Sequence, residues 1–237
     1  MKSTHFLIIL FAIISHSLVS QTTLSKDYKT VYSQSFSSNK SPREFEFSDA
    51  SKWLISKNGE SGKALKCLGE GSYKNAHGGP RVVAIVKNYE LEDFVMEMDV
   101  MQQGKNFELL DFCIFFGIED QEHYSYAQLA SKADKNTHNV FTINGDQPQR
   151  IGKKQEKGIW WGLNKWNHVK IERFEADKIL KVYFNDELVL DIKDNDELFN
   201  NGLVGFGSSS SALKIDNLKI IASEYKESDK AIFPKTE

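Results

Sequence analysis

The sequence predicts an all-β protein, an antiparallel β-sandwich in which two sheets pack face to face. Short runs rich in β-branched and aromatic residues recur along the chain, and Gly, Asn and Asp separate them. Helical periodicity of apolar residues is hard to find, and the 237 residues include only 4 prolines. Because 40% of the residues are hydrophobic, the chain is long enough to bury one sizeable core.

The first 20 residues are expected to be a secretory signal peptide. Lys2 supplies a positive charge, residues 6–14 form an apolar run, and small residues precede a cleavage position after Ser20. The apolar run is far shorter than the roughly 20 residues that a membrane span needs, so no membrane insertion is expected. Residues 21–27 are expected to be a linker. Export to the periplasm or the extracellular space follows.

A single sandwich domain is expected over residues 28–222, followed by a charged tail at 223–237 that is expected to be poorly ordered. The expected strands, in chain order, are Thr30–Phe36, Lys52–Ile55, Ala64–Leu68, Arg81–Val86, Phe94–Met101, Phe112–Ile118, Tyr124–Leu129, Asn139–Ile143, His168–Phe174, Ile179–Phe184, Glu187–Ile192, Leu203–Phe206 and Leu213–Ile221. Asn185 and Asp186 tolerate the positive φ of a two-residue turn, which predicts a hairpin between the strands on either side.

The stretch "FVMEMDV", residues 94–100, combines a core strand with two acidic side chains. A strand points successive side chains to opposite faces. Phe94 and the three apolar residues that alternate with it therefore share the core face. Glu97 and Asp99 lie together on the other face, about 6–7 Å apart along the strand.

Composition excludes several classes of function. The formal net charge is −3, and no basic cluster is interleaved with aromatic residues, which argues against nucleic acid and anionic membranes as partners. No catalytic Ser-His-Asp order, phosphate-binding glycine loop or zinc spacing is present. The carboxylates in "GIED" and "IKDNDE" are ligands of the kind Ca²⁺ takes, but they form no twelve-residue calcium loop, so no cofactor is predicted. Cys67 and Cys113 are consistent with either a disulfide or two buried thiols.

From His77 to Ile221 the order of motifs is familiar. The segments are "HGGPRVVAIVKNYELEDFVMEMDV", "DFCIFFGIEDQEHYSYAQLASKADKNTHNVFTING", "WWGLNKWNHVKIER", "LKVYFNDELVLDIKD" and "GLVGFGSSSSALKIDNLKI". Together they resemble exported bacterial proteins of the concanavalin A-like lectin/glucanase superfamily. The nearest are laminin-G-like sandwiches related to the group that includes 3-keto-disaccharide hydrolases. The resemblance implies a jelly-roll fold and a carbohydrate as partner.

The chain departs from the pattern of this family at three places. A His-Arg-Asp triplet often precedes the "CxFFG" strand in the family, and here Leu109 and Leu110 precede Asp111. Gln128 stands where the family often has a His, and "GSSSS" ending at Ser211 replaces "GSFDD". If these polar groups bind or catalyse in relatives, this chain has lost several of them.

The resemblance also implies roles for the two carboxylates. Glycanases of the superfamily carry Glu-x-Asp-x-(x)-Glu, which supplies a nucleophile, a supporting Asp and a proton donor, and a retaining mechanism needs two carboxyls about 5–5.5 Å apart. Glu97 and Asp99 match the first two positions, but Met101 or Gln102 stands at the third. The candidate catalytic pair is therefore incomplete, and a solvated strand face is the alternative.

The residues between 123 and 161 are the best candidates for ligand contacts, because sugars are bound by aromatic rings together with Asn, Gln, Asp and His side chains. Tyr126 and Gln128 share one strand face, although strand tyrosines also serve simply as packing. Of the adjacent Trp160 and Trp161, one is expected to offer a stacking surface, and loop packing is equally consistent. The candidates are His123, Tyr126, Gln128, His138, Asn139, Arg150 and Trp161.

Three functions remain open. The leading hypothesis is an exported carbohydrate-binding protein linked to polysaccharide recognition or degradation. The alternative is a glycoside hydrolase or related enzyme that uses Glu97 and Asp99. The third is a structural or adhesion module without a small ligand.

Overall fold

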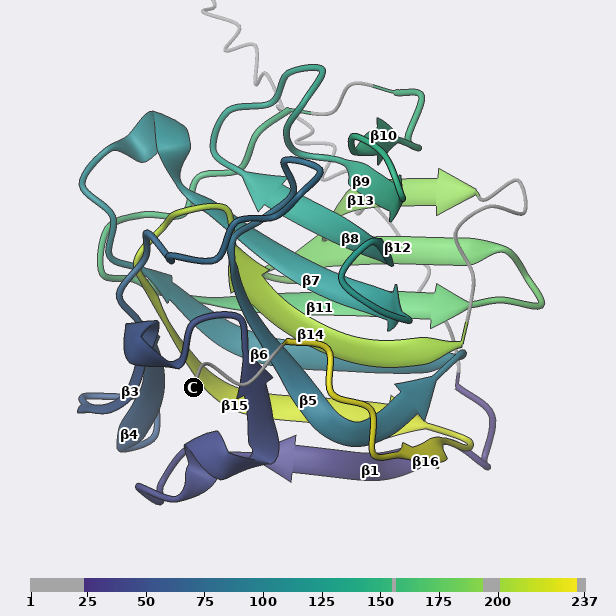
Figure 1. Ribbon diagram of the computed structural model, residues 1–237, viewed down its shortest axis with the longest axis horizontal. Coiled ribbons are helices and arrows are strands. Elements are labelled where there is room, and N and C mark those ends of the chain that lie inside the picture. The colour runs from purple at the N-terminus through teal and green to yellow at the C-terminus, as the bar shows by residue number, and fades with distance from the viewer. Residues whose placement is uncertain (1–23, 155–156, 194–200, 234–237) are drawn as a thin grey trace, which may run out of the picture.

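The computed structural model describes residues 24–154, 157–193 and 201–233, which form two antiparallel sheets packed face to face (Figure 1). The predicted fold class is therefore confirmed. The expected signal peptide and the start of the linker lie outside the described residues. Within the described part of the chain, no helix is both long enough and apolar enough to cross a membrane.

Each sheet contains eight strands. Sheet A runs in the order β13 (Glu187–Lys193), β12 (Ile179–Phe184), β11 (Trp166–Phe174), β6 (Phe94–Gln102), β15 (Leu213–Ala222), β4 (Lys63–Cys67) and β3 (Trp53–Lys57), with β1 (Lys29–Gln34) paired to β15. Sheet B runs in the order β10 (Gln149–Arg150), β9 (Val140–Asn144), β8 (His123–Ala130), β7 (Asp111–Ile118), β14 (Gly202–Ser208), β5 (Val82–Leu91) and β16 (Lys226–Ser228), with β2 (Phe45–Phe47) also paired to β5. Sheet B faces the viewer in Figure 1. Three short 3-10 helices are η1 (Ser41–Glu44), η2 (Ala50–Lys52) and η3 (Phe107–Leu109).

The core lies between the two sheets and is built by the alternation that the sequence predicts. On β6, the apolar residues from Phe94 to Val100 are fully buried, whereas Glu97 and Asp99 on the other face are partly exposed. All thirteen expected strands are present, at slightly different bounds, because each carries an apolar face long enough to cross the core. The strands β2, β10 and β16 were not expected. Each is two or three residues long, which is too short to show the apolar and polar alternation that marks a strand.

The hairpin between β12 and β13 forms where the sequence predicts it. Asn185 and Asp186 have φ values of 50° and 66°, and Phe184 pairs with Glu187 across the turn. Two consecutive positive φ values give a turn whose twist matches that of the strands.

The C-terminal segment is ordered over its described part, contrary to the expectation for residues after Ala222. Strand β16 pairs with β5, and the chain then runs across the front of sheet B (Figure 1). The carboxylate of Glu46 accepts hydrogen bonds from the backbone N–H groups of Ile232 and Phe233, at 2.9 and 2.6 Å. Two apolar residues in a charged tail were too few to reveal this contact in the sequence.

Both cysteines are buried free thiols, which decides the alternative that the sequence left open. Cys67 belongs to β4 in sheet A and Cys113 to β7 in sheet B. Burial raises the pKa of Cys67 to about 11, and burial together with the nearby Asp111 carboxylate raises the pKa of Cys113. Neither thiol is therefore prone to ionise and react at neutral pH.

The two neighbouring tryptophans have opposite environments. Trp161 is 1% exposed and packs edge-on against Phe112 and Phe184, with ring centroids 6.3 and 5.0 Å away. Trp160 is 72% exposed. Adjacent residues in extended chain point in opposite directions, so only one of the two can enter the core.

This difference predicts a large contrast in stability between two alanine variants. Trp161→Ala leaves a cavity among aromatic side chains and should lower the free energy of unfolding by about 3–5 kcal/mol. Trp160→Ala removes a mostly exposed ring that stacks on Phe107 and should change it by no more than about 1.5 kcal/mol. Urea denaturation followed by tryptophan fluorescence measures both, and equal losses would contradict the assignment.

Candidate functional site

The outer face of sheet B carries a cleft of about 930 Å³. Its floor is formed by Tyr126 and Gln128 of β8 and by Phe141 of β9. Its walls come from three loops and the end of β14, namely Lys74, Asn75, Gly78, Gly79, Pro80, Arg81, Lys135, Asn136, Thr137, Gln147, Pro148 and Ser209. The cleft therefore combines an aromatic floor with a polar rim, which is the usual composition of a small-ligand site.

Strand alternation places the floor residues. Tyr124, Tyr126 and Gln128 share the outer face of β8, as the sequence predicts. The ring of Tyr126 stacks on that of Phe141, with centroids 5.3 Å apart, and tilts against that of Phe115 at 5.8 Å. Because Tyr126 is only 4% exposed, it forms a fixed apolar floor and presents no open ring face.

The buried carboxylate of Asp111 fixes the end of the floor. Its Oδ2 accepts from Gln128 Nε2 at 2.8 Å and from the Ser209 backbone N–H at 3.0 Å. Its Oδ1 accepts from the hydroxyls of Ser208 and Ser211, at 2.7 and 3.2 Å. Gln128 Nε2 also donates to the Ser209 hydroxyl at 3.1 Å, so both N–H groups of the amide are engaged and its Oε1 is the group left for a ligand.

The three departures from the family pattern meet at this point. Leu109, Leu110, Asp111, Gln128, Ser209 and Ser210 all line a second hollow of about 270 Å³. This hollow shares Gln128, Thr137 and Ser209 with the main cleft, so the two form one continuous groove. Residues that lie about 100 positions apart in the chain therefore make up a single polar site.

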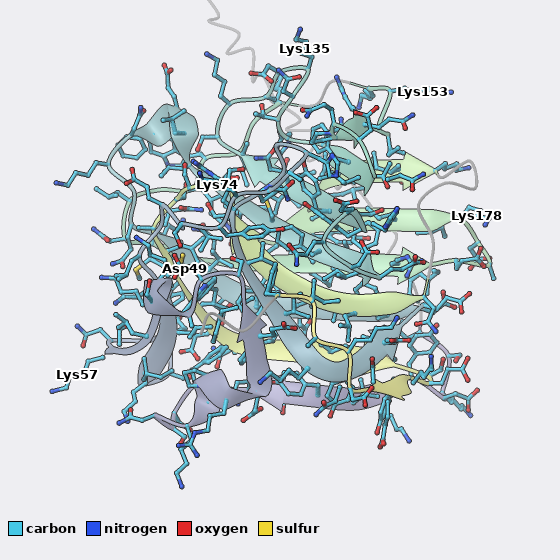
Figure 2. All side chains as sticks on the ribbon, in the orientation of Figure 1. Asp49, Lys57, Lys74, Lys135, Lys153 and Lys178 are labelled. Carbon is cyan, nitrogen blue, oxygen red and sulfur yellow. The ribbon has the colours of Figure 1, made fainter. Side chains whose placement is uncertain are left out.

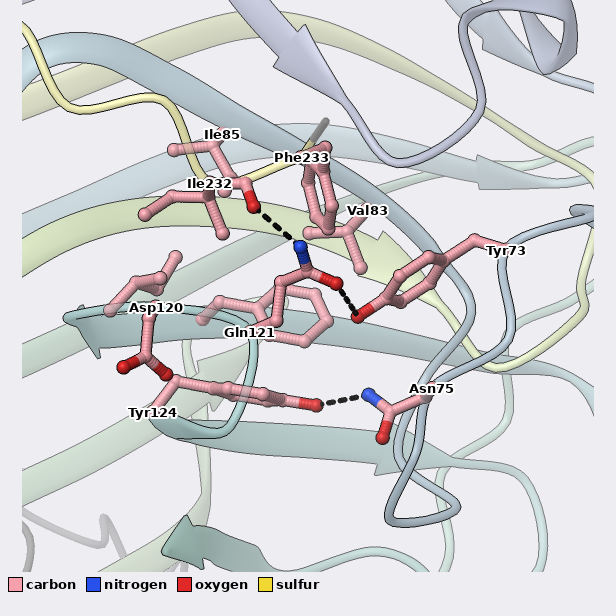
Figure 3. Close-up of a pocket in the computed structure, with 11 residues that line it drawn as sticks. Tyr73, Asn75, Val83, Ile85, Asp120, Gln121, Tyr124, Ile232 and Phe233 are labelled. Atoms are coloured by element: carbon pink, nitrogen blue, oxygen red, sulfur yellow. Dashed lines mark hydrogen bonds between the residues drawn. The ribbon is translucent and has the colours of Figure 1, made fainter. Parts of the chain in front are cut away.

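The C-terminal segment closes the other end of the same face. Figure 3 shows Ile232 and Phe233 over Val83 and Ile85, above a small hollow of about 20 Å³. Gln121 Nε2 donates to the Ile232 carbonyl at 2.8 Å. Because these two apolar residues cover one part of sheet B, the cleft remains open only over β8 and β9.

Glycine brings the loop before β5 down onto the sheet. A Cβ added at Gly79 would lie 2.5 Å from the Tyr124 hydroxyl, so a larger residue would push the loop outward. Asn75 Nδ2 donates to the same hydroxyl at 2.6 Å (Figure 3). The loop is thereby held as a wall of the cleft.

His138 and Asn139 are corrected from ligand contacts to structural residues. Both are fully buried. His138 Nδ1 accepts from the Ala130 N–H at 3.1 Å. Asn139 Oδ1 accepts from the N–H groups of Val140 and Gly152, at 2.9 and 2.8 Å. These contacts hold the loop ends on either side of β9.

Arg150 and His123 also lie away from the lining of the cleft. Arg150 Nη2 donates to the Lys154 carbonyl at 2.8 Å. His123 stands at the opposite end of β8 from Gln128 and pairs with Asp120 at 2.9 Å. The hydrogen bond that His123 donates to Asp120 raises the pKa of His123. Of the seven expected contacts, Tyr126 and Gln128 are the two that the structure brings together.

Trp161 is corrected from a stacking residue to a core residue, because its ring is buried. Trp160 takes the exposed position, and its ring lies parallel to that of Phe107 in η3, at 5.4 Å and 5°. Phe107 is 40% and Leu109 is 65% exposed. The end of the groove beside Leu109 therefore has an exposed aromatic pair, in which Phe107 belongs to η3 and Trp160 to a distant loop.

Glu97 and Asp99 lie on the outer face of sheet A, on the far side of the core from the cleft. Lys219 Nζ contacts Glu97 at 2.9 Å. His168 Nδ1 lies 3.1 Å from Asp99 and its Nε2 lies 3.9 Å from Glu97. Asn217 Nδ2 donates to Asp99 at 2.7 Å. Both carboxylates are thus engaged in a surface charge network.

The charge network shifts two pKa values. The hydrogen bond that His168 donates to Asp99 raises the pKa of His168 from its ordinary 6.5 and outweighs burial, which works in the opposite direction. Burial works to raise the pKa of Asp99, but the hydrogen bonds from His168 and Asn217 outweigh it and leave that pKa below its usual value. Both shifts are those of a paired His and Asp that stabilise each other.

Sequence reasoning missed the loops that wall the cleft. The Gly-Gly-Pro sequence before β5 indicated only a turn. Nothing in the residues around Lys135 or Gln147 indicated that these two loops lie beside that turn in the folded protein. Among the described residues, no group of three or more His, Cys, Asp or Glu side chains could hold a metal ion. The segment "IKDNDE" lies outside the described residues after Lys193.

No family model matches the chain, and no curated protein matches it in sequence. Solved structures share its fold. The carbohydrate-binding module CBM66 from Bacillus subtilis has a TM-score of 0.54 at 17% identity, over 76% of this chain and 96% of that one. The carbohydrate recognition domain of Emp47p has a TM-score of 0.52 at 11% identity, over 83% of this chain and 95% of that one. A GH43 protein, BlXynB, from Bacillus licheniformis has a TM-score of 0.55 at 11% identity, over 85% of this chain and 40% of that one. The chain therefore shares the β-sandwich fold of these structures.

The His168 pair predicts a pH dependence of stability. Because the folded pKa of His168 is raised, its stabilisation is complete below about pH 6.5 and is lost as the pH rises through the folded value. The difference in unfolding free energy between the wild type and His168→Gln should therefore shrink from about pH 5.5 to about pH 8.5. In an Asp99→Asn background this pH dependence should flatten. An equal difference at both pH values in urea titrations would refute the pairing.

Proposed function

We propose that this protein binds a carbohydrate in the cleft on the outer face of sheet B. The observation that carries the proposal is the composition of this cleft, in which Tyr126, Gln128 and Phe141 form the floor below a rim of amides, hydroxyls and cations. A sugar ring has apolar C–H faces and a polar edge of hydroxyls. An apolar floor with hydrogen-bonding walls matches both.

Oriented polar groups supply specificity in such a site. The Gln128 amide is held by Asp111 and cannot rotate without breaking two hydrogen bonds. Asn136 and Gln147 stand exposed on the rim, on the loops that follow β8 and β9. A pre-oriented amide loses little entropy on binding, which favours affinity for the rather weakly bound hydroxyl groups of a sugar.

The likeness to a carbohydrate-binding module and to a carbohydrate recognition domain supports the proposal at the level of the fold. One fold hosts many functions, so this support is analogy, and the cleft carries the argument. The predicted signal peptide would place the protein in the periplasm or outside the cell, where polysaccharides are met. We therefore propose an exported protein for polysaccharide recognition or degradation.

The other two hypotheses have weaker support. A glycanase built on Glu97 and Asp99 would need a substrate groove on sheet A, and both carboxylates there are engaged by Lys219, His168 or Asn217. The charged outer face of sheet A fits a structural or adhesion module. The cleft on sheet B is what favours a bound ligand over that alternative.

Replacement of cleft residues should weaken glycan binding. Gln128→Ala and Asn136→Ala should each lower the affinity about fivefold to tenfold, which is the loss of about one hydrogen bond. A glycan array identifies the bound sugar, and calorimetry then measures the affinity of each variant. Asn136→Ala is exposed and tests the site without a risk to folding.

Glu97→Gln is the matched control, because it changes a carboxylate on the opposite sheet. Its affinity should equal that of the wild type. Absence of binding across diverse glycans would overturn the proposal. Loss of binding in Glu97→Gln, with Gln128→Ala and Asn136→Ala unaffected, would transfer the site to sheet A.

A further inference from the structure

The main cleft on sheet B is lined by three cationic residues and by no acidic residue, whereas Glu108, Asp111 and Asp134 line the adjoining hollow together with Lys132. Lys74, Arg81 and Lys135 belong to the lining, whose other members are all uncharged. The chain as a whole contains 33 acidic and 30 basic residues. The positive charge is therefore a property of the main cleft, and neither the adjoining hollow nor the protein as a whole shares it.

The three cations are available to a ligand. All three side chains are exposed, and the ion pairs among the described residues do not include any of them. Elsewhere on the surface, lysines such as Lys219 and Lys226 contact glutamates at 2.9 and 3.2 Å. A cation without an internal partner keeps its full attraction for an incoming anion.

The cations stand on two different loops around the floor. Lys74 and Arg81 flank the Gly-Gly-Pro turn before β5, and Lys135 lies on the loop between β8 and β9. Figure 2 shows Lys74 in front of sheet B and Lys135 on the loop at the top. A ligand chain that lies in the cleft would pass between the two loops, so its anionic groups would meet cations at more than one position.

The floor argues against nucleic acid as the anionic ligand. Single-stranded nucleic acid is held by open aromatic faces on which bases stack. Tyr126 and Phe141 are only 4% and 2% exposed, and each covers the other's ring. What the cleft does offer, together with its cations, is amide and hydroxyl groups, and these match the hydroxyls of a sugar.

We infer that the glycan bound in this cleft is anionic and carries carboxylate or sulfate groups that pair with Lys74, Arg81 and Lys135. This inference rests on the proposed carbohydrate binding and specifies its substrate class. Carboxylates in uronic acids and sulfate esters share the chemistry that cations recognise. The opposite charge in the cleft also speeds encounter with such a chain.

The test compares chains that differ only in charge. The probes are polygalacturonate and its methyl ester, alginate and its propylene glycol ester, and dextran sulfate and dextran, each titrated by calorimetry. At least one charged member should bind about tenfold or more tightly than its neutral counterpart. This preference should fade as salt rises from about 0.05 M to about 0.5 M. The uronate and sulfate arms then distinguish the two sources of negative charge.

Charge-removing variants locate the effect. Lys74→Gln, Arg81→Gln and Lys135→Gln should each lower the affinity for the charged probe about twofold to fivefold, as expected for an exposed ion pair, and leave the neutral counterpart unchanged. Lys57→Gln on β3 is the matched control, because Lys57 is also exposed but lies far from the cleft (Figure 2). It should bind every probe as the wild type does.

Each contrary outcome is distinct. Equal binding of charged and neutral chains, or binding of neutral glycans alone, overturns the anionic inference and leaves carbohydrate binding intact. Equally tight binding of a single-stranded oligonucleotide also overturns it. Failure to bind any glycan, charged or neutral, overturns the proposed function together with the inference. A loss in Lys57→Gln equal to that in Lys74→Gln would show that the attraction is not local to the cleft.

Discussion

The burial of two apolar sheet faces against each other is the constraint on which the rest of this structure depends. Every strand that crosses the core commits its inward side chains to that contact, from Phe94 on β6 to Phe112 on β7. Burial of an aromatic or branched side chain contributes about 1.5–3 kcal/mol, which few surface interactions match. Polar chemistry is therefore confined to the two outer faces and to the loops around them.

The two outer faces have different roles. On sheet A, Glu97, Asp99, His168 and Lys219 neutralise one another across neighbouring strands. On sheet B, the tail residues Ile232 and Phe233 cover one part of the face, and the remainder is open. A face whose charges are mutually satisfied has little to offer a ligand. The open part of sheet B retains cations and oriented amides, and that contrast places the proposed site there.

Asp111 links the fold to the site. Its carboxylate joins β7 to β8 through Gln128 and to the end of β14 through Ser208 and Ser211. A buried carboxylate is costly unless it is fully hydrogen-bonded, and here four donors satisfy it. The serine run at residues 208–211 supplies three of those donors, the hydroxyls of Ser208 and Ser211 and the backbone N–H of Ser209. These hydrogen bonds hold one end of the groove in a fixed arrangement around the Asp111 carboxylate.

By itself, the sequence determined the strands, their core faces and the hairpin at Asn185, because the period of two and the turn residues are local properties of the chain. It also placed Tyr126 and Gln128 on one face for the same reason. It could not decide which of Trp160 and Trp161 enters the core, because adjacent positions carry the same residue. Only the tertiary structure decided where Lys74, Arg81 and Lys135 meet, because loops have no period and the sheet order alone makes distant segments neighbours.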